Sequence, residues 1–168
     1  MKRNLLFLAL SVLLLCASCD REERRLTGDY SYKLSGEVAL TDADGQTTHH
    51  LVHRNGQMNI RKDKSQKAIY IITMNEMAGG AYTMKAEVHG DSLRIDPYSF
   101  SSNILSTMDL PSIGQDENPS LVYQITAFGG GILNEDILII REAWTGYQSG
   151  NSTVRVYGPE MTIIAEKN

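Results

Sequence analysis

The chain has 168 residues and a formal net charge of −4 at pH 7, which is long enough for one domain with a real core. Its acidic balance and its lack of a basic patch with interleaved aromatic residues argue against nucleic acid as a partner. The two cysteines are Cys16 and Cys19, so the sequence beyond them offers no thiol for a disulfide, a metal site or a nucleophile.

The chain begins with a hydrophobic leader. Met1-Lys2-Arg3 is basic, and the apolar run Leu5–Leu15 is broken only by Ser11. This run is shorter than the roughly 20 apolar residues that a transmembrane helix needs. It is typical of the core of a signal peptide.

The residues that follow, Ala17 and Ser18 before Cys19, resemble the lipobox of bacterial lipoproteins. In that family the leader is cut just before the cysteine, which then carries acyl chains. The resemblance implies a signal peptide over residues 1–18, lipidation of Cys19, and a cell-envelope protein held to the membrane by its lipid. An ordinary secretory signal with two incidental cysteines is the alternative.

Residues 19–26 form a charged segment. Asp20–Arg25 holds nothing apolar to bury, so we predict a mobile tether. Acidic residues after the lipidated cysteine resemble the surface-export signal of Bacteroides-type lipoproteins, which implies an outer membrane lipoprotein exposed at the cell surface. A plain solvated spacer is the alternative.

Residues 27–168 are predicted to form one β-domain. Tyr30, Tyr32 and Leu34 alternate with polar residues and mark the first strand. Asp44-Gly45 predicts a turn, and Asn55-Gly56 predicts a hairpin with a two-residue loop. With about nine or ten short strands, the pattern favours an all-β fold, a single antiparallel up-and-down barrel, with a β-sandwich as the alternative.

A further hairpin at Gly90-Asp91 predicts its own register. A two-residue loop there pairs apolar residues on one face and opposite charges on the other, each charge pair contributing roughly 0.2–1 kcal/mol. A slip of one residue would destroy both patterns. The predicted pairs are Val88–Leu93 and Ala86–Ile95 on the apolar face, and Glu87–Arg94 and Lys85–Asp96 on the charged face.

The rest of the chain continues this pattern. Gly129-Gly130-Gly131 is predicted to be a bulge or a bend between strands, and Gly158-Pro159 is predicted to separate the last two strands. The segment Ser99–Pro119 is a long connector, which in a compact domain is usually functional or disordered; we predict a cover over the barrel. The strands expected besides those at the hairpins are residues 68–74, 121–128, 136–144, 153–157 and 161–166.

The sequence shows no clear catalytic or metal site. On a strand only His49 and His53 share a face, and zinc needs three or four ligands, so no metal is expected. Asp136 and Glu142 would lie about 20 Å apart on their strand, and we interpret them as a solvated strand edge. With no triad of catalytic residues, we expect neither an enzyme nor a cofactor.

A candidate binding wall lies on Ala81–Val88, where Tyr82 and Met84 face the same way. Methionines and tyrosines make an adaptable wall for a small ligand. Trp144, the only tryptophan, shares a strand face with Leu138. We predict Tyr82, Met84 and Trp144 as ligand-binding residues; simple filling of the interior is the alternative for the same side chains.

The lipobox at Cys19, the opening Leu26–Tyr30 and the serial hairpins resemble the small lipocalin-like (calycin-like) lipoproteins of Bacteroides-type bacteria. The resemblance implies a barrel that fills its interior or holds one small ligand. Lipocalins begin with Gly-X-Trp, for which this chain has Gly28-Asp29-Tyr30. They also place an arginine over that aromatic ring, for which Arg155 is the candidate.

The expected function is that of a non-enzymatic, lipid-anchored envelope protein that binds a small apolar or amphipathic ligand. One alternative is an accessory subunit that contacts other proteins of an envelope complex. The other is a surface hydrolase or isomerase.

Overall fold

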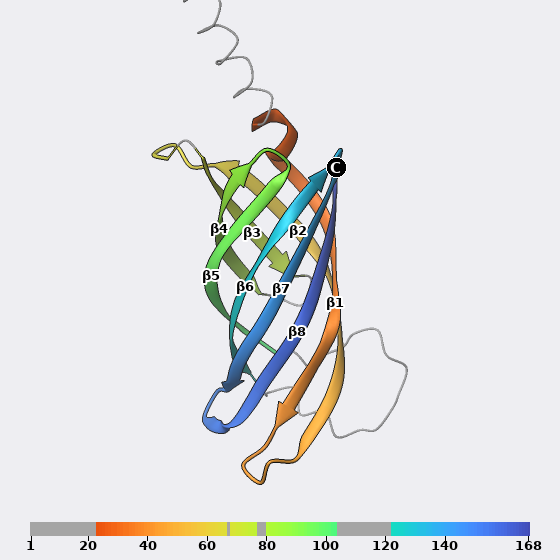
Figure 1. Ribbon diagram of the computed structural model, residues 1–168, viewed down its shortest axis with the longest axis vertical. Coiled ribbons are helices and arrows are strands. Elements are labelled where there is room, and N and C mark those ends of the chain that lie inside the picture. Colours follow the sequence, from red (N-terminus) through yellow and green to blue (C-terminus); the bar gives the residue numbers. More distant parts are fainter. Residues whose placement is uncertain (1–22, 67, 77–79, 104–121) are drawn as a thin grey trace, which may run out of the picture.

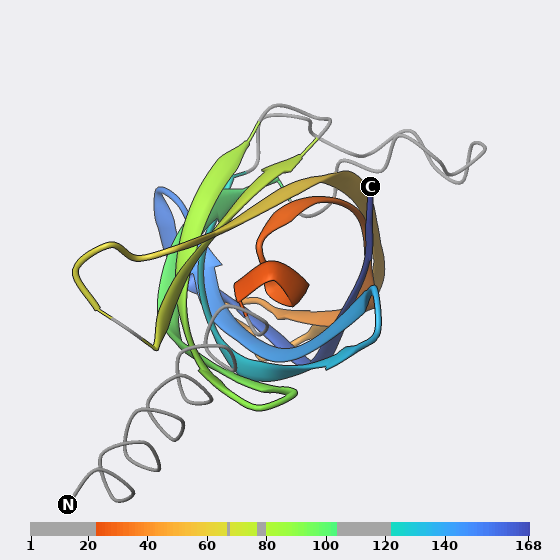
Figure 2. The same ribbon diagram turned by 90° about the horizontal axis from the view of Figure 1, so that it is seen from above.

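The computed structural model describes residues 23–66, 68–76, 80–103 and 122–168, and these form one closed barrel of antiparallel strands in chain order (Figure 1 and Figure 2). The predicted up-and-down barrel is confirmed, and the β-sandwich is excluded because β8 closes on β1. There are eight strands, fewer than expected: β1 (Gly28–Thr41), β2 (Thr47–Lys62), β3 (Ile69–Glu76), β4 (Ala81–His89), β5 (Ser92–Ser102), β6 (Tyr123–Asn134), β7 (Ile137–Gln148) and β8 (Asn151–Lys167).

The signal peptide, Cys19 and most of the expected connector lie outside the described residues. Residues 99–102 of that connector belong to β5. Among the described residues, no helix has the length and apolar character needed to cross a bilayer. We call the end of the barrel where β1 begins the upper end, and the end with the β1–β2 and β7–β8 turns the lower end (Figure 1).

The core is the interior of the barrel. Side chains alternate between solvent and interior along each strand, as in the pattern of β2 from Leu51 to Ile60, because successive strand residues point to opposite faces. Apolar residues of all eight strands fill the interior. Its largest fully buried side chains include Trp144, Tyr30, Tyr123, Met58 and Met74.

The hairpin predicted at Asn55-Gly56 is wrong. Both residues lie within β2, which runs without interruption and pairs with β1 and β3. Gly56 serves a packing need instead. A Cβ atom there would come within 2.2 Å of the Asn75 carbonyl oxygen and 2.7 Å of the Tyr32 ring. The glycine therefore lets a neighbouring backbone and an aromatic ring approach closely.

The other two turns are confirmed. Asp44-Gly45 lies in the β1–β2 turn, where Gly45 has a φ of 79° and donates its N–H to the Asp42 carbonyl over 3.2 Å. The β4–β5 hairpin turns at Gly90-Asp91, and its register holds from Ala86–Ile95 to His89–Ser92. Arg94 contacts Glu87 at 2.7 Å. The fourth predicted pair, Lys85–Asp96, falls beyond the paired stretch.

The expected break at Gly158-Pro159 is a bulge in one long strand. Between Met161 and Tyr157, β8 carries one residue more than β1 does between Gly36 and Ala39. Proline has no N–H to donate, so it suits the unpaired position of a bulge. The glycines at 129–131 also lie within a continuous strand, β6, and pair in regular register with β7. They form neither a bend between strands nor a bulge, because the extra residue of the nearby register shift belongs to β5.

Residues 23–26 differ from the predicted mobile tether. They form a helical turn inside the ring of strands at the upper end (Figure 2). Leu26 is buried, and its carbonyl accepts a hydrogen bond of 2.8 Å from the Tyr30 hydroxyl. Charged partners hold the turn to the barrel: Glu23 with Lys62 at 2.7 Å, and Arg25 with Asp91 at 2.9 Å. Sequence patterns did not predict this turn, because the residues that hold it lie far from it in the sequence.

The cation over the first-strand aromatic ring is a lysine. Lys167 Nζ lies 5.9 Å from the centre of the buried Tyr30 ring and donates a hydrogen bond of 2.8 Å to the Arg24 carbonyl. Arg155, the expected candidate, is exposed and pairs with Thr41 and Tyr147. The expectation for Arg155 is therefore wrong, because its side chain follows the outward-facing set of β8.

Candidate functional site

The backbone pairing of the barrel wall is incomplete between β4 and β5. Backbone pairing covers only the upper part of this seam and ends at Ala86–Ile95. Just beyond, β5 carries one extra residue, because Ile95 pairs with Gly129 but Tyr98 pairs with Ala127. Pro97 lies in this bulge, where a missing N–H is tolerated. Below the bulge, no residues of β4 and β5 are paired.

The bulge directs aromatic side chains into the barrel. Asp96 and Pro97 are both exposed, and the burial pattern resumes with Tyr98 and Phe100 inside. A regular strand would have sent Tyr98 and Phe100 outward, because inward positions recur every second residue. The bulge therefore places two rings at the unpaired part of the seam.

Three stacked rings fill the lower part of the seam. Tyr82 of β4 stacks on Phe100 with ring centres 4.6 Å apart and on Tyr98 at 5.7 Å, with planes within 15°. Trp144 meets Phe100 edge-on at 5.3 Å. We call Tyr82, Tyr98, Phe100 and Trp144 the aromatic wall. Tyr82 is its one partly exposed member, so solvent reaches the wall from there.

A buried carboxyl group lies behind the aromatic wall. Glu142 of β7 is 3% exposed. The Tyr98 hydroxyl lies 2.9 Å from both carboxyl oxygens, and Trp144 Nε1 donates to Oε2 at 3.1 Å. Two donors of the wall therefore converge on one acid.

Burial dominates the electrostatics of this group. Desolvation raises the pKa of Glu142, and the hydrogen bonds from Trp144 and Tyr98 oppose that rise only in part. The pKa of Tyr98 is also raised, first by burial and then by the charge of Glu142. Tyr98 therefore stays protonated and keeps its role as a donor.

The three predicted ligand-binding residues share the barrel interior but not one cluster. Phe100 links Tyr82 to Trp144 by direct ring contacts. Met84 is also buried, but it lies further up β4, opposite Ile72. Binding of a ligand by these residues stays a prediction.

Sequence reasoning missed Glu142, Tyr98 and Phe100. Glu142 is buried, so its interpretation as part of a solvated strand edge is wrong. The signal was present, because Glu142 stands in the same alternation as Leu138, Ile140 and Trp144, all buried. Asp136 is exposed at the β6–β7 turn.

The histidines form polar contacts on the surface. His49 lies 2.7 Å from Glu37 across β1 and β2, and His50 lies 3.0 Å from the Thr48 hydroxyl. His53 is exposed on the outside of β2. In the described parts of the chain, no three His, Cys, Asp or Glu side chains gather closely enough to hold a metal ion.

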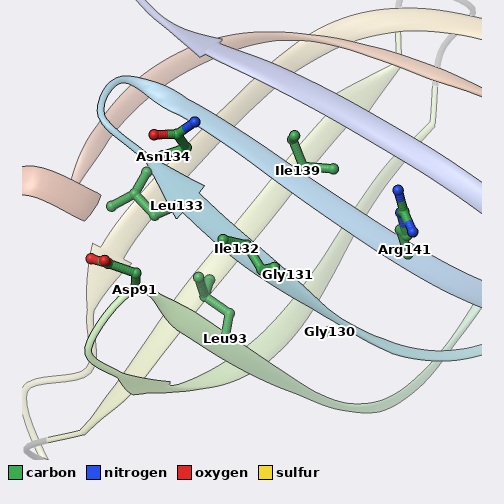
Figure 3. A pocket seen from close by; sticks show the side chains of 9 residues that line it. All are labelled: Asp91, Leu93, Gly130, Gly131, Ile132, Leu133, Asn134, Ile139 and Arg141. Carbon is green, nitrogen blue, oxygen red and sulfur yellow. The ribbon is translucent and has the colours of Figure 1, made fainter.

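A second feature is a hollow of about 710 Å³ lined by residues of β5, β6 and β7 (Figure 3). Gly130, one of its lining residues, lets β5 and β6 approach closely, because a Cβ atom there would lie 2.7 Å from the Leu93 carbonyl oxygen. Ile132 and Ile139 line the hollow, and they form a row with Ile164 through the pairs Ile132–Ile139 and Ile139–Ile164 across β6, β7 and β8. We call these three side chains the isoleucine row; Ile132 and Ile164 are exposed.

Comparison with known proteins gives no relative. No family model, curated protein or solved structure matches the chain. A barrel alone does not determine function. We therefore infer the function from the chemistry of the aromatic wall, of Glu142 and of the outer surface.

Proposed function

We propose that this chain is a lipocalin-like lipoprotein of the cell envelope, anchored by lipid at Cys19, that binds a small apolar or amphipathic ligand without catalysing a reaction. The ligand binds at the aromatic wall, inside the lower half of the barrel. The observation that carries this proposal is the stack of Tyr82, Tyr98 and Phe100 over a seam without backbone pairing.

A seam held by side chains opens more easily than one held by backbone hydrogen bonds. Ring stacking contributes about 0.5–1.5 kcal/mol per pair beyond burial, and a side chain can rotate while both strands keep their other neighbours. Tyr82 is the accessible member, so movement of this ring exposes Phe100 and Tyr98. Apolar rings with a few convergent polar groups are typical of small-molecule sites.

A matched pair of tyrosine variants tests the site. Tyr82→Ala removes the accessible ring of the wall, whereas Tyr157→Ala removes a tyrosine that is 55% exposed on β8. Fatty acids, bile acids, haem and lipophilic amines and alcohols would be screened by Trp144 emission and by melting temperature. A ligand at 100 times its Kd stabilises the fold by about 2.7 kcal/mol.

We expect Tyr82→Ala to weaken binding of any hit by more than about tenfold, the loss of about 1.4 kcal/mol, and Tyr157→Ala to leave it unchanged. Absence of any hit across these classes would contradict the proposal. Equal weakening by both variants would place binding outside the aromatic wall.

The lipid anchor has its own test. Cys19→Ala should abolish labelling with a radioactive fatty acid and move the protein from the membrane fraction to the soluble fraction. Cys16→Ala is the matched control and should keep the label. Retained label in the Cys19→Ala protein would refute the anchor.

The isoleucine row favours a second candidate, an accessory subunit that contacts an apolar surface of another envelope protein. Ile139→Lys places a charge in the middle of the row. If this function is correct, the substitution should abolish site-specific cross-links from the neighbouring Thr162 position to a second protein in intact cells. Unchanged cross-links would count against it.

A further inference from the structure

The two oxygens of the Glu142 carboxylate are not equally satisfied. Oε2 accepts hydrogen bonds from Tyr98 and Trp144, whereas Oε1 receives only a share of the same Tyr98 hydroxyl hydrogen. A carboxylate offers about four lone-pair positions. Oε1 therefore has acceptor capacity that these side chains leave unused.

The carboxylate also has no positive partner among the residues that the structure describes. None of their Lys, Arg or His nitrogens lies within 4.0 Å of it. The other buried charged side chain, Arg54, donates to the Asn103 backbone carbonyl. Tyr98 and Trp144 are neutral donors, so a full negative charge remains when Glu142 ionises.

A cation is the group that this environment lacks. An isolated charge is costly to bury, whereas a charge paired with its opposite and hydrogen-bonded is tolerated. Aromatic ring faces also attract cations through their negative π-surface. Here four rings lie within one contiguous set of contacts around the acid. Both features favour a positive group over a neutral or negative one.

We propose that the ligand is an amphipathic amine whose ammonium group donates to Glu142 Oε1 while its apolar part lies on the aromatic wall. This inference depends on the proposed function, because it specifies the chemistry of the ligand that the wall binds. It assigns charge recognition to Glu142, and apolar recognition to Tyr82, Phe100 and Trp144.

Three probes with the same alkyl chain separate the amine proposal from the broader proposal that the barrel binds an apolar or amphipathic ligand. Decylamine, decanol and undecanoate share one ten-carbon alkyl chain and carry a positive, a neutral and a negative head group. Their binding to the mature protein would be measured by calorimetry at neutral pH, below the concentration at which each forms micelles. We expect decylamine to bind about tenfold or more tighter than decanol, and undecanoate to bind weakest.

Two variants assign the preference to one residue. Glu142→Gln keeps the shape of the side chain and removes its charge, so it should reduce the preference for decylamine over decanol to less than about twofold. Glu160→Gln removes one charge from an exposed position on β8 and should keep the preference. Binding of decanol shows whether the aromatic wall of each variant is intact. A misfolded variant is therefore recognised by its loss of decanol binding.

If Glu142→Gln loses decanol binding as well, Glu142→Asp is tested in its place. Glu142→Asp keeps the charge and withdraws it by one methylene. That variant should bind decanol normally and show a reduced amine preference. Equal binding of all three probes by the natural chain would overturn the amine proposal and leave the binding function standing. Binding of none would refute both.

Discussion

Burial of Glu142 predicts an unusual pH dependence of stability. The unfolded chain has the ordinary carboxyl pKa of 4.5, and the folded pKa is higher. Between these two values the folded protein keeps a proton that the unfolded chain has lost. The contribution of Glu142 to the free energy of unfolding is therefore fully present below pH 4.5 and is lost as the pH rises through this window, by at most about 1.4 kcal/mol for each pH unit.

Glu142→Gln removes this dependence at a cost that does not vary with pH. The amide has an NH2 group where the carboxyl group has its second oxygen. The Tyr98 hydroxyl, which lies 2.9 Å from both carboxyl oxygens, therefore keeps one acceptor and faces a donor in place of the other. Loss of such a hydrogen bond costs about 1–2 kcal/mol. We therefore expect the variant to be less stable than the natural chain near pH 4.5, and the difference to shrink and then reverse as the pH rises.

The assay is urea unfolding from about pH 4 to about pH 9, followed by emission of Trp144, which is 1% exposed when folded. Titration of all other groups cancels in the difference between the two proteins. Glu160→Gln is the control and should track the natural chain. A difference between Glu142→Gln and the natural chain that stays constant over the whole pH range would refute the argument from burial.

Three further predictions concern the fold. Exchanging Glu87 and Arg94 together should cost less stability than reversing either alone, with a coupling of about 0.2–1 kcal/mol that salt weakens; zero coupling in low salt would contradict the pairing. Gly56→Ala should destabilise by about 3 kcal/mol in urea unfolding, because the new Cβ meets a backbone oxygen; a cost below about 1 kcal/mol would show that the strands relax. Leu26→Ala should cost about 2–4 kcal/mol, whereas a truly mobile segment would tolerate it with no measurable change.

Local patterns predicted much of the fold. The alternation in β1 and the charge pair Glu87–Arg94 depend on residues close in sequence, and both appear in the structure. The hairpin predicted at Asn55-Gly56 is wrong because this glycine is required by the close approach of Tyr32 and Asn75, which belong to two neighbouring strands. A turn signal cannot be told from a close-packing requirement until the strand partners are known.

The candidate site was harder to predict for a related reason. One extra residue at Asp96-Pro97 reverses which side chains of β5 face inward, so a strict alternation read from the start of the strand places Tyr98 outside. Glu142 was judged by its residue type, although the buried residues on either side of it in the alternation predict an inward position. Residue type alone is a poor guide where a buried polar group has partners on other strands.

The helical turn inside the upper end determines how the proposed lipoprotein stands on the membrane. A chain reaches at most about 3.6 Å per residue, so the path from Cys19 to Glu23 spans no more than about 14 Å. Glu23 and Arg25 are fixed to the barrel rim by Lys62 and Asp91, which leaves no slack on the barrel side. The upper end must then face the bilayer at close range, and the unpaired seam opens toward the aqueous side, where it meets ligands in solution and not lipids of the anchoring leaflet.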